Sequence, residues 1–559
     1  MSKQNQLIAA LTLLVVFSLL FFFHLGATLV TEPEEAVYAE VSREMYRDSE
    51  AVMPTLNGNG YFAQPPMLYW SQMLGYELFG INSLGARSVN ALCGLATILI
   101  FFFCAGTPLG IRTAFNSAAI LGSSVLFVYF SRVATTGMLL SMFLVISIVS
   151  FWFAVERSIA ERNAHLLFLV SAFAGGCAIL CTGPSALLFP AVTFIVYLIS
   201  VRRVSLIFRL DTMLPAAAIL LVTGCSWYVM LGFIHPGGFE FAKELFTRHL
   251  FDWFPQAAEA APFFSSIAVL LIGLFPWVFY LPLAAAHGTV IFGRGPAARF
   301  VRIFVIFSIV AFGFLPFTAG GFSDLVLSAL PGLALLTAAL FNRETMGFPT
   351  LWLSAGWLAA ALSIVTAVLL GASPLIIPYL SDLLGENSRN LPLLAEPVRL
   401  GSAVWIGVVL FIFSAVIIIR YGRTRDMHLV FQGLLLSSFI VSSTIFLILM
   451  PLYDRLLNQP LAALCLTAAE HTAEDGRIVL YSIGERPGVM FASARSTISL
   501  DDSQSHQLPL LFAEDDISVG ITTNYYYARL LNHSIGVRQI DRQGGFVLFS
   551  ANEKNSSVD

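Results

Sequence analysis

The stretch LIAALTLLVVFSLLFFFHLGATLV, from Leu7 to Val30, is apolar almost throughout its roughly 24 residues. A helix needs about 20 apolar residues to cross a hydrocarbon core of roughly 30 Å. Lys3 precedes the stretch as it would in a secretory signal, but the apolar run is too long for a signal and contains no A-x-A-like cleavage site. We therefore expect a retained membrane-spanning helix.

The rest of the chain has the same character. Of the 559 residues, 57% are hydrophobic and only 11% are charged, and the mean hydropathy is +0.81, whereas soluble domains average about 25% charged residues. Runs such as 404–419 are apolar on all sides instead of alternating, which predicts membrane helices and not the strands of a barrel. Breaks in hydropathy predict about thirteen spans, near residues 7–30, 84–105, 114–130, 137–155, 165–182, 185–200, 212–234, 263–286, 303–319, 325–341, 348–371, 402–420 and 428–450.

Arginines in the predicted turns indicate the orientation. If the N-terminus is cytoplasmic, nearly every cytoplasmic turn carries arginine, as the positive-inside rule requires. These arginines are Arg112, Arg157, Arg162, Arg202, Arg203, Arg209, Arg294, Arg299, Arg302, Arg343, Arg420, Arg423 and Arg425. An odd number of spans then places the loops 31–83, 235–262 and 372–401, and the residues after about 451, on the other side. We expect a multi-pass protein of the bacterial inner membrane whose C-terminus is periplasmic.

Two domains are predicted. Residues 1–450 form an all-α polytopic membrane domain, whose first periplasmic loop, 31–83, contains two amphipathic pieces that we expect to lie as helices on the membrane surface. One piece runs from Glu34 to Tyr46, and the other begins behind Pro65-Pro66, where a helix starts easily, and runs to about Phe79. Residues 451–559 form a small soluble α/β domain. Its predicted strands cover 477–481, 489–492, 497–500 and 545–550, and a helix is predicted over 525–531.

Several classes of function are disfavoured by the composition. The net charge of −4 and the lack of a Lys/Arg run argue against nucleic acid as a partner. Five of the six cysteines lie in predicted spans, which leaves Cys465 alone in the terminal domain and predicts neither a disulfide framework nor a cysteine metal site. No P-loop, HExxH or dinucleotide motif is present, so we expect no metal and no cofactor. A transporter or channel is disfavoured because almost no ionisable residue falls in the middle of a predicted span.

The first periplasmic loop carries the residues best suited to chemistry. Several carboxylates, among them Glu34 and Glu35, crowd the exit of the first helix. A carboxylate shielded there by lipid and protein could take a proton from an acceptor hydroxyl as a general base. The solvated polar face of an interfacial helix accounts for the same pattern and is the simpler interpretation of the residues alone.

The order of residues in this loop resembles the membrane glycosyltransferases of the GT-C superfamily, in the protein mannosyltransferase and aminoarabinose (lipid A) transferase group. The family pattern is roughly Asp-Glu-x-Arg-Tyr-Ala-Glu, followed by Asn-Gly…Tyr-Phe-Glu-Lys-Pro-Pro-Leu-x-Tyr-Trp. The residues that match it are Glu35, Tyr38, Ala39, Glu40, Asn57, Gly58, Tyr61, Phe62, Pro65, Pro66, Tyr69 and Trp70. Further matches continue in order as far as Pro331. The resemblance implies a GT-C fold and the transfer of a sugar from a polyprenyl-phosphate carrier to a lipid, polysaccharide or protein acceptor.

The resemblance also implies roles for individual residues. Glu34 stands where the family has its catalytic Asp, so Glu34, with Glu35, is the implied general base. The implied substrate-binding residues are Tyr38, Tyr61, Arg87, Arg132 and His249, the last three for the lipid phosphate. A membrane-anchoring side chain accounts for Arg132 about as well, and an ordinary interfacial loop residue for His249.

Several positions depart from the family pattern and make the active site divergent. Val37 replaces its Arg, Ala63-Gln64 replaces its Glu-Lys, Gly137 replaces an Asp, and Gly321 stands near its late Lys. Recognition of a phosphate at low dielectric depends on such cations. The departures leave an alternative, in which the chain is a catalytically impaired relative that acts as a lipid-binding or scaffolding subunit for a membrane protein partner.

Overall fold

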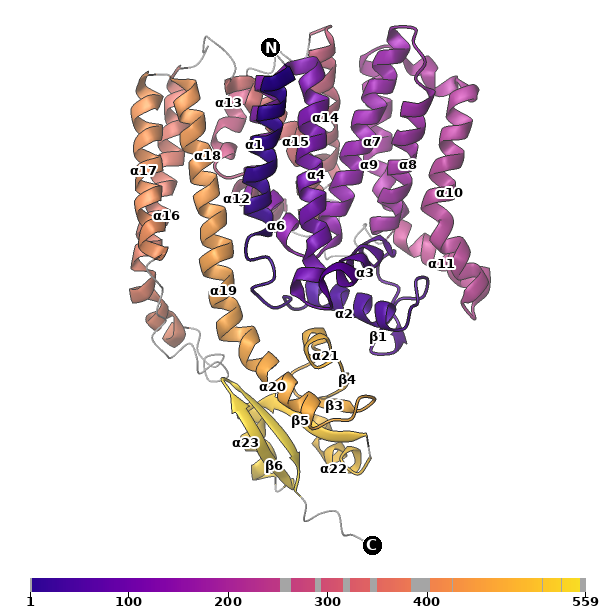
Figure 1. Ribbon diagram of the computed structural model, residues 1–559, viewed down its shortest axis with the longest axis vertical. Helices are drawn as coiled ribbons and strands as arrows, with labels where there is room; N and C mark the ends of the chain where they lie inside the picture. Colours follow the sequence, from indigo (N-terminus) through magenta and orange to yellow (C-terminus); the bar gives the residue numbers. More distant parts are fainter. Residues whose placement is uncertain are drawn as a thin grey trace.

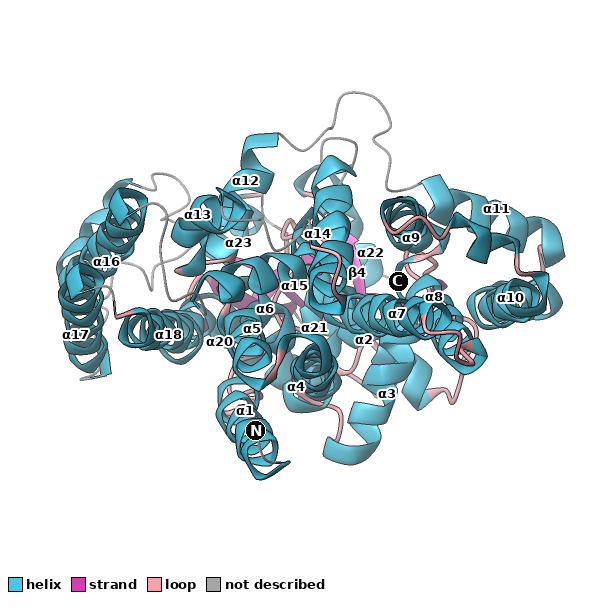
Figure 2. Cartoon of the chain, turned by 90° about the horizontal axis from the view of Figure 1, so that it is seen from above, coloured by secondary structure: helices cyan, strands magenta, loops and turns pink. Residues whose placement is uncertain are grey.

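The computed structural model describes residues 3–251, 263–286, 293–314, 322–341, 349–383, 403–424, 426–514, 516–533 and 535–552. The chain forms a bundle of long helices with a small sheet domain at one end, opposite the face that carries the N-terminus (Figure 1). From above, the bundle is elongated, with α16 (Pro349–Leu383) and α17 (Ala403–Thr424) paired at one end and α10 (Leu210–Ile234) and α11 (Gly238–Phe251) at the other (Figure 2).

Nine helices of the described chain are long and apolar enough to cross a membrane. They are α1 (Lys3–Phe22), α4 (Ser83–Leu109), α7 (Thr136–Ile159), α8 (His165–Thr182), α10, α14 (Pro296–Phe314), α16, α17 and α18 (Met427–Thr444) with its continuation to Tyr453. Most begin and end within several residues of a predicted span, but α1 ends at Phe22 instead of near residue 30, and α16 continues to Leu383 instead of ending near residue 371. The prediction of a helical multi-pass membrane protein is therefore confirmed.

Four of the thirteen predicted spans differ from a simple long helix. Two are bent pairs: α5 (Ile111–Ser123) with α6 (Val125–Arg132), at 63°, and α12 (Phe263–Gly273) with α13 (Leu281–Ala286), at 106°. Two are shorter apolar helices: Pro184–Ser200, which includes α9 (Leu188–Ser200), and Val326–Phe341, which lies within α15 (Phe322–Phe341). Counting each bent pair once gives up to eleven candidate spans in the described residues, so the predicted number of thirteen is reached only with the two short helices.

The first outer loop folds close to its predicted boundaries. It contains α2 (Glu34–Arg47), a small hairpin of β1 (Thr55–Leu56) and β2 (Asn59–Gly60), and α3 (Met67–Phe79). Helix α2 is more buried than an interfacial helix would be, because it packs against α3 on one side and against α21 (Pro487–Ser493) of the terminal domain on another (Figure 1).

The terminal domain is a five-stranded mixed sheet in the order β4-β3-β5-β7-β6. Its strands are β3 (Arg477–Tyr481), β4 (Ser496–Leu500), β5 (Ile517–Thr523), β6 (Val537–Gln543) and β7 (Phe546–Ala551). Alternate residues of β3 enter two separate cores, one against α20 (Gln459–Glu470) and one against α23 (Asn524–Asn532). The predicted α/β domain is confirmed, but the predicted strand at 489–492 is wrong. Those residues lie in α21, because Pro487 presets the first helical turn.

The terminal domain is attached to the membrane bundle by a continuous helical rod. Helix α18 runs through the π-helical turn η8 (Ile445–Leu449), α19 (Met450–Tyr453) and the π-helical turn η9 (Asp454–Asn458) into α20 (Figure 1). The predicted domain boundary near residue 451 therefore falls inside this rod. Because both the first loop and the terminal domain lie on the face opposite the N-terminus, their predicted location on one side of the membrane agrees with the fold.

We expect the turn between α7 and α8 to face the cytoplasm and the terminal domain to face the periplasm. Glu161→Cys and Asn532→Cys each replace an exposed residue, one in that turn and one at the end of α23. A membrane-impermeant maleimide added to intact cells should label the Asn532→Cys variant and leave the Glu161→Cys variant unlabelled until the cells are opened. The unaltered chain is the control, because most of its cysteines are buried. The reverse labelling pattern would refute the orientation.

Candidate active site

The site is organised by the first turn of α2, where two neighbouring glutamates point in different directions. Successive side chains on a helix are about 100° apart. As a result the side chain of Glu35 is completely buried, while Glu34 is exposed. The two residues that the sequence placed together as one general base therefore occupy different environments.

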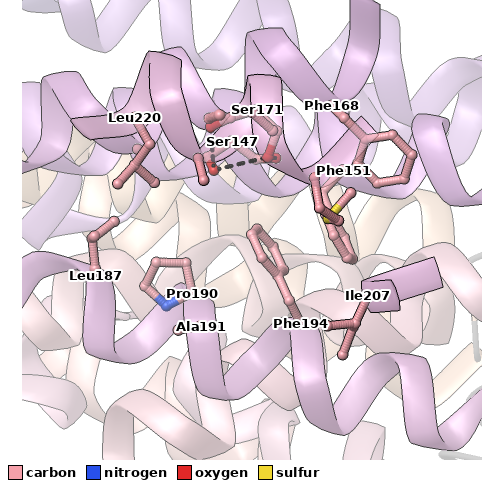
Figure 3. A pocket seen from close by; sticks show the side chains of 15 residues that line it. Ser147, Phe151, Phe168, Ser171, Leu187, Pro190, Ala191, Phe194, Ile207 and Leu220 are labelled. Atoms are coloured by element: carbon pink, nitrogen blue, oxygen red, sulfur yellow. Dashed lines mark hydrogen bonds between the residues drawn. The ribbon is translucent and has the colours of Figure 1, made fainter. Parts of the chain in front are cut away.

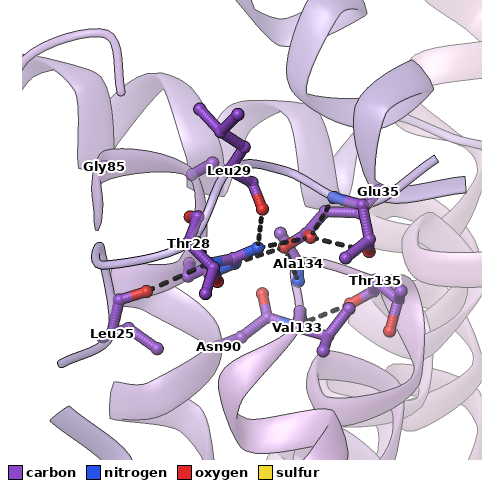
Figure 4. A network of polar contacts seen from close by, with 12 residues as sticks. Leu25, Thr28, Leu29, Glu35, Gly85, Asn90, Val133, Ala134 and Thr135 are labelled. Carbon is purple, nitrogen blue, oxygen red and sulfur yellow. Dashed lines mark hydrogen bonds and ion pairs between the residues drawn. The ribbon is translucent and has the colours of Figure 1, made fainter. Parts of the chain in front are cut away.

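Glu35 forms a closed ion pair with Arg87 of α4 (Figure 4). The Arg87 Nε lies 2.6 Å from Oε1 and Nη2 lies 2.7 Å from Oε2. The same carboxylate accepts hydrogen bonds from the backbone N–H of Ala134 (2.9 Å) and from the N–H and hydroxyl of Thr31 (2.8 and 2.9 Å). Both oxygens of Glu35 are thus fully engaged.

The N–H donors of the Arg87 guanidinium are all hydrogen-bonded as well. Its remaining donors reach the carbonyls of Leu25 (3.1 Å), Thr28 (2.9 Å) and Leu29 (2.7 Å), in the segment that leads from α1 to α2. Asn90, one turn further along α4, donates to the carbonyls of Val133 and Thr135 in the turn between α6 and α7. The network therefore joins α4 to the end of α1, to the start of α2 and to the α6–α7 turn.

The electrostatics keep Glu35 charged. Burial raises the pKa of Glu35, but the charge and hydrogen bonds of Arg87, together with those of Ala134 and Thr31, outweigh burial and hold the pKa below its ordinary value. An ionised carboxylate whose lone pairs are all occupied is a poor acceptor for a substrate proton. Glu35 therefore positions the first turn of α2 and is not available as a base.

Glu34 lies beside a cluster of tyrosines. Burial and the nearby charge of Glu34 raise the pKa of Tyr61, which follows the β1–β2 hairpin. Tyr69 of α3 is completely buried, its hydroxyl has no hydrogen-bond partner in the described chain, and its ring lies 6.3 Å from that of Tyr38. Burial, with smaller contributions from Tyr38 and Tyr61, raises the pKa of Tyr69. The predicted residues Glu34, Tyr38 and Tyr61 are therefore neighbours, and Tyr69 joins them.

Arg132 caps the C-terminal end of α1. Its two terminal nitrogens donate to the carbonyls of Leu20 (2.7 Å), Phe21 (3.1 Å) and Phe23 (2.9 Å), which is where a helix leaves its carbonyls unpaired. Its guanidinium also lies 4.9 Å from the centre of the Phe446 ring. Its Nε, however, has no hydrogen-bond partner among the described residues, and neither does the buried hydroxyl of Ser442. Both residues line one cavity of about 300 Å³ between α1 and the rod that begins with α18.

His249 of α11 lies apart from the tyrosine cluster and is held by neighbours on both ring nitrogens. Nε2 donates to the carbonyl of Phe62 (3.0 Å), so Nδ1 accepts from the hydroxyl of Tyr228 (2.8 Å). The ring stacks against Trp227, which itself donates to the carbonyl of Val52 (2.8 Å). His249 thus fastens α10 and α11 to the first outer loop.

Buried charges on α2 were not anticipated from the sequence. Arg43 pairs with Glu40 three residues earlier (Nε to Oε2, 2.7 Å), and both are almost completely buried. Glu44 accepts from the hydroxyl of Thr55 (2.6 Å) and from the backbone N–H of Asn57 (2.7 Å), which holds the β1–β2 hairpin. The i, i+3 spacing of Glu40 and Arg43 was the only signal in the sequence for this arrangement.

In the described part of the chain, no cluster of His, Cys, Asp and Glu side chains could hold a metal ion.

The positions that depart from the family pattern are neutral here. Val37 and Gln64 are half-buried and Gly137 begins α7, so none supplies a charge. The departures at Gly321, and the whole segment 252–262, lie outside the described residues.

The sequence of this chain is similar to those of several known proteins. A family model described as dolichyl-phosphate-mannose-protein mannosyltransferase matches residues 63–228. An undecaprenyl phosphate-alpha-4-amino-4-deoxy-L-arabinose arabinosyl transferase of Edwardsiella ictaluri is 28% identical over 338 residues, which cover 60% of this chain and 59% of the relative. This chain is a homologue of the GT-C membrane glycosyltransferases. An uncharacterized protein of Aquifex aeolicus is 27% identical over 342 residues, 60% of this chain and 64% of that protein.

The fold of this GT-C homologue has a solved counterpart. The crystal structure of ArnT from Cupriavidus metallidurans bound to undecaprenyl phosphate matches with a TM-score of 0.74 over the whole of both chains, at 17% identity. The fold expected from the resemblance, including the small terminal domain, is therefore confirmed. The sequence matches span only about three-fifths of the length of the curated relatives.

We expect Arg87→Met to destabilise this GT-C homologue by about 3–5 kcal/mol, because the substitution leaves Glu35 buried and unpaired. In detergent, the temperature at which the monodisperse peak is lost on size exclusion should fall sharply. Arg47→Met is the matched control, since the Arg47–Asp48 pair is exposed and should contribute under about 1 kcal/mol. Equal effects of the two substitutions would refute the structural role of Arg87.

The contribution of Glu35 should depend on pH. Its native pKa lies below its unfolded value, so its stabilisation is present above the unfolded pKa of about 4.3 and is lost as the pH falls through the native pKa. Thermal unfolding of the unaltered protein and of Glu35→Gln should therefore differ most near pH 7 and converge in acid. A difference that stays constant down to about pH 3 would contradict the assignment.

Proposed function

We propose that this protein transfers a sugar from a polyprenyl-phosphate carrier to a lipid, polysaccharide or protein acceptor at the periplasmic face of the bacterial inner membrane. The observation that carries the proposal is the state of Glu34. It is the exposed member of the glutamate pair, it has neither hydrogen bond nor ion pair to another described residue, and it lies beside Tyr61. Glu34 is thus a carboxylate that remains free to meet a substrate.

In this reaction Glu34 takes the proton of the acceptor hydroxyl while the acceptor oxygen bonds to the anomeric carbon of the sugar. The bond from that carbon to the phosphate oxygen breaks, and the polyprenyl phosphate leaves with the electron pair. General-base assistance of this kind contributes about 10²- to 10⁴-fold to a rate. Tyr38 and Tyr61, in the same cluster, are proposed to hydrogen-bond the sugar, and Glu35 with Arg87 holds the α2 turn that carries Glu34.

The lipid phosphate is proposed to lie toward Arg132. Arg132, whose Nε has no partner among the described residues, and Ser442, whose hydroxyl is likewise unpaired, line one cavity whose other walls are largely apolar. Donors of this kind at low dielectric stabilise a departing phosphate. Arg87 and His249 are proposed to act by positioning, because the groups that would reach a ligand already have partners within the protein.

The alternative is a relative that has lost catalysis and serves as a lipid-binding or scaffolding subunit. The observation that favours it is the same set of internal bonds. The arginines predicted to bind the phosphate mainly donate hydrogen bonds to carbonyls and to Glu35. The family pattern has cations at the positions of Val37 and Gln64, and these cations are absent here. Such a subunit would present its periplasmic domain to a membrane protein partner.

Replacing Glu34 distinguishes the two functions. In membranes supplied with a polyprenyl-linked sugar donor, Glu34→Gln should lower transfer at least 100-fold at normal protein levels, because the amide cannot take a proton. Glu34→Asp, which restores the residue of the family pattern, should retain transfer. Asp48→Asn removes an exposed carboxylate from the end of the same helix and is the control.

Unchanged transfer in the Glu34→Gln variant would eliminate Glu34 as the base. If no variant transfers sugar, and affinity purification in mild detergent recovers a stoichiometric membrane protein, the scaffolding function is correct instead.

A further inference from the structure

A second cavity lies in the half of the bundle nearest the N-terminal face, between α7, α8, α9 and α10 (Figure 3). Its volume is about 340 Å³. Helix α10 packs against α8, and α9 packs against α14. Seen from above, α9 and α10 stand apart (Figure 2), and residues of both line the cavity. Ala191 of α9 and Ala217 of α10 line the cavity and are exposed, which makes it a groove open toward the surrounding bilayer.

The walls of this groove suit a hydrocarbon chain. Phe151 and Phe194 stack with ring centres 3.8 Å apart, and Phe168 extends the same aromatic wall (Figure 3). Ser147 and Ser171 are polar, but they bond to each other's carbonyls at 3.0 and 2.9 Å and present no unpaired group to a ligand. An apolar groove whose polar atoms are already satisfied favours an apolar occupant.

The length of the groove places the occupant in one leaflet. On α10 the lining residues run from Met213 to Leu220, which corresponds to about 10 Å at 1.5 Å per residue. That is less than the half-thickness of a hydrocarbon core of roughly 30 Å. The groove therefore starts at Ile207, near the N-terminal face, and reaches as far as Leu187 and Leu220.

Three arginines flank the short helix that contributes Ile207 to the groove. Arg202 and Arg203 precede the short helix η2 (Val204–Phe208), which contributes Ile207 to the lining, and Arg209 follows it. All three are exposed, and their side chains form no ion pair with any described acid. The acid nearest along the chain, Asp211, instead faces His165 at 3.8 Å. An apolar groove that ends in a cationic rim is complementary to a lipid with an anionic headgroup.

We propose that this groove binds one acyl chain of an anionic phospholipid of the cytoplasmic leaflet, with the headgroup phosphate at Arg202, Arg203 and Arg209. The site is separate from the Glu34 site, which lies at the opposite face of the bundle, and it does not depend on the function proposed for Glu34. Its occupant fills the space between α9 and α10 and thereby supports α10, which carries the residues that hold His249.

Native mass spectrometry of the full-length protein in mild detergent tests the proposal, with dioleoyl phosphatidylglycerol and dioleoyl phosphatidylethanolamine as probes. Phosphatidylglycerol should bind at least tenfold more tightly. The double substitution Arg203→Gln and Arg209→Gln should weaken its binding about 25-fold, since each basic residue near an anionic headgroup contributes about a factor of five. Ala217→Phe fills the groove and should remove the preference. Ala218→Phe is the control, because Ala218 is exposed on α10 but does not line the groove.

Three results would overturn the proposal. Equal affinity for the two lipids, or equal behaviour of Ala217→Phe and Ala218→Phe, would show only nonspecific lipid around the protein. Competition by undecaprenyl phosphate for the same groove would assign it to the carrier chain. If Ala217→Phe is not monodisperse, Ala191→Leu fills the groove from the other side and must give the same loss.

Discussion

The buried ion pair between Glu35 and Arg87 is the interaction on which the outer face of this protein depends. Taking two charges out of water is costly, and the cost is recovered only if every donor and acceptor is satisfied. Here the carboxylate accepts three hydrogen bonds besides those of Arg87, and the guanidinium reaches three carbonyls beyond α1. This requirement fixes the rotation of α2, and with Glu35 directed inward its neighbour Glu34 must face outward.

The terminal domain is hydrogen-bonded to the same outer loop. The side chain of Asn57 pairs reciprocally with the backbone of Thr497 (2.8 and 3.1 Å), and the N–H of Gly488 donates to Glu32 (2.6 Å). Asp454 accepts from the N–H of Leu29 (3.1 Å), one of the residues whose carbonyls hold Arg87. Because the domain is also the continuation of α18, it is joined both to the loop that carries Glu34 and to the helix that lines the Arg132 cavity.

The membrane helices could be predicted from hydropathy because a bilayer imposes the length and composition of each span. Helices α2 and α3 could be predicted because proline and amphipathic spacing mark them. Strands β5 and β6 were both missed. In β6, Arg538, Asp541 and Arg542 interrupt the apolar alternation, as is common on an edge strand. In the site, the sequence predicted Glu34 and Glu35 as one general base but could not show that Glu34 is exposed and Glu35 is buried. Their difference is decided by Arg87, which lies 52 residues away from Glu35.

The distribution of cations explains how one fold could serve two different lipids. At the outer face, Arg87 and Arg132 are hydrogen-bonded to carboxylate and carbonyl groups, and the Nε of Arg132 has no partner among the described residues. At the opposite face, three exposed arginines flank the short helix that contributes Ile207 to the apolar groove. Internal hydrogen bonding of the cations suits a site where a phosphate must arrive and leave, since a strongly cationic pocket would retain the product carrier. Unpaired surface arginines suit a lipid that stays. In the proposed reaction, the loss of family cations near Glu34 would weaken binding of the leaving phosphate without removing the proposed base.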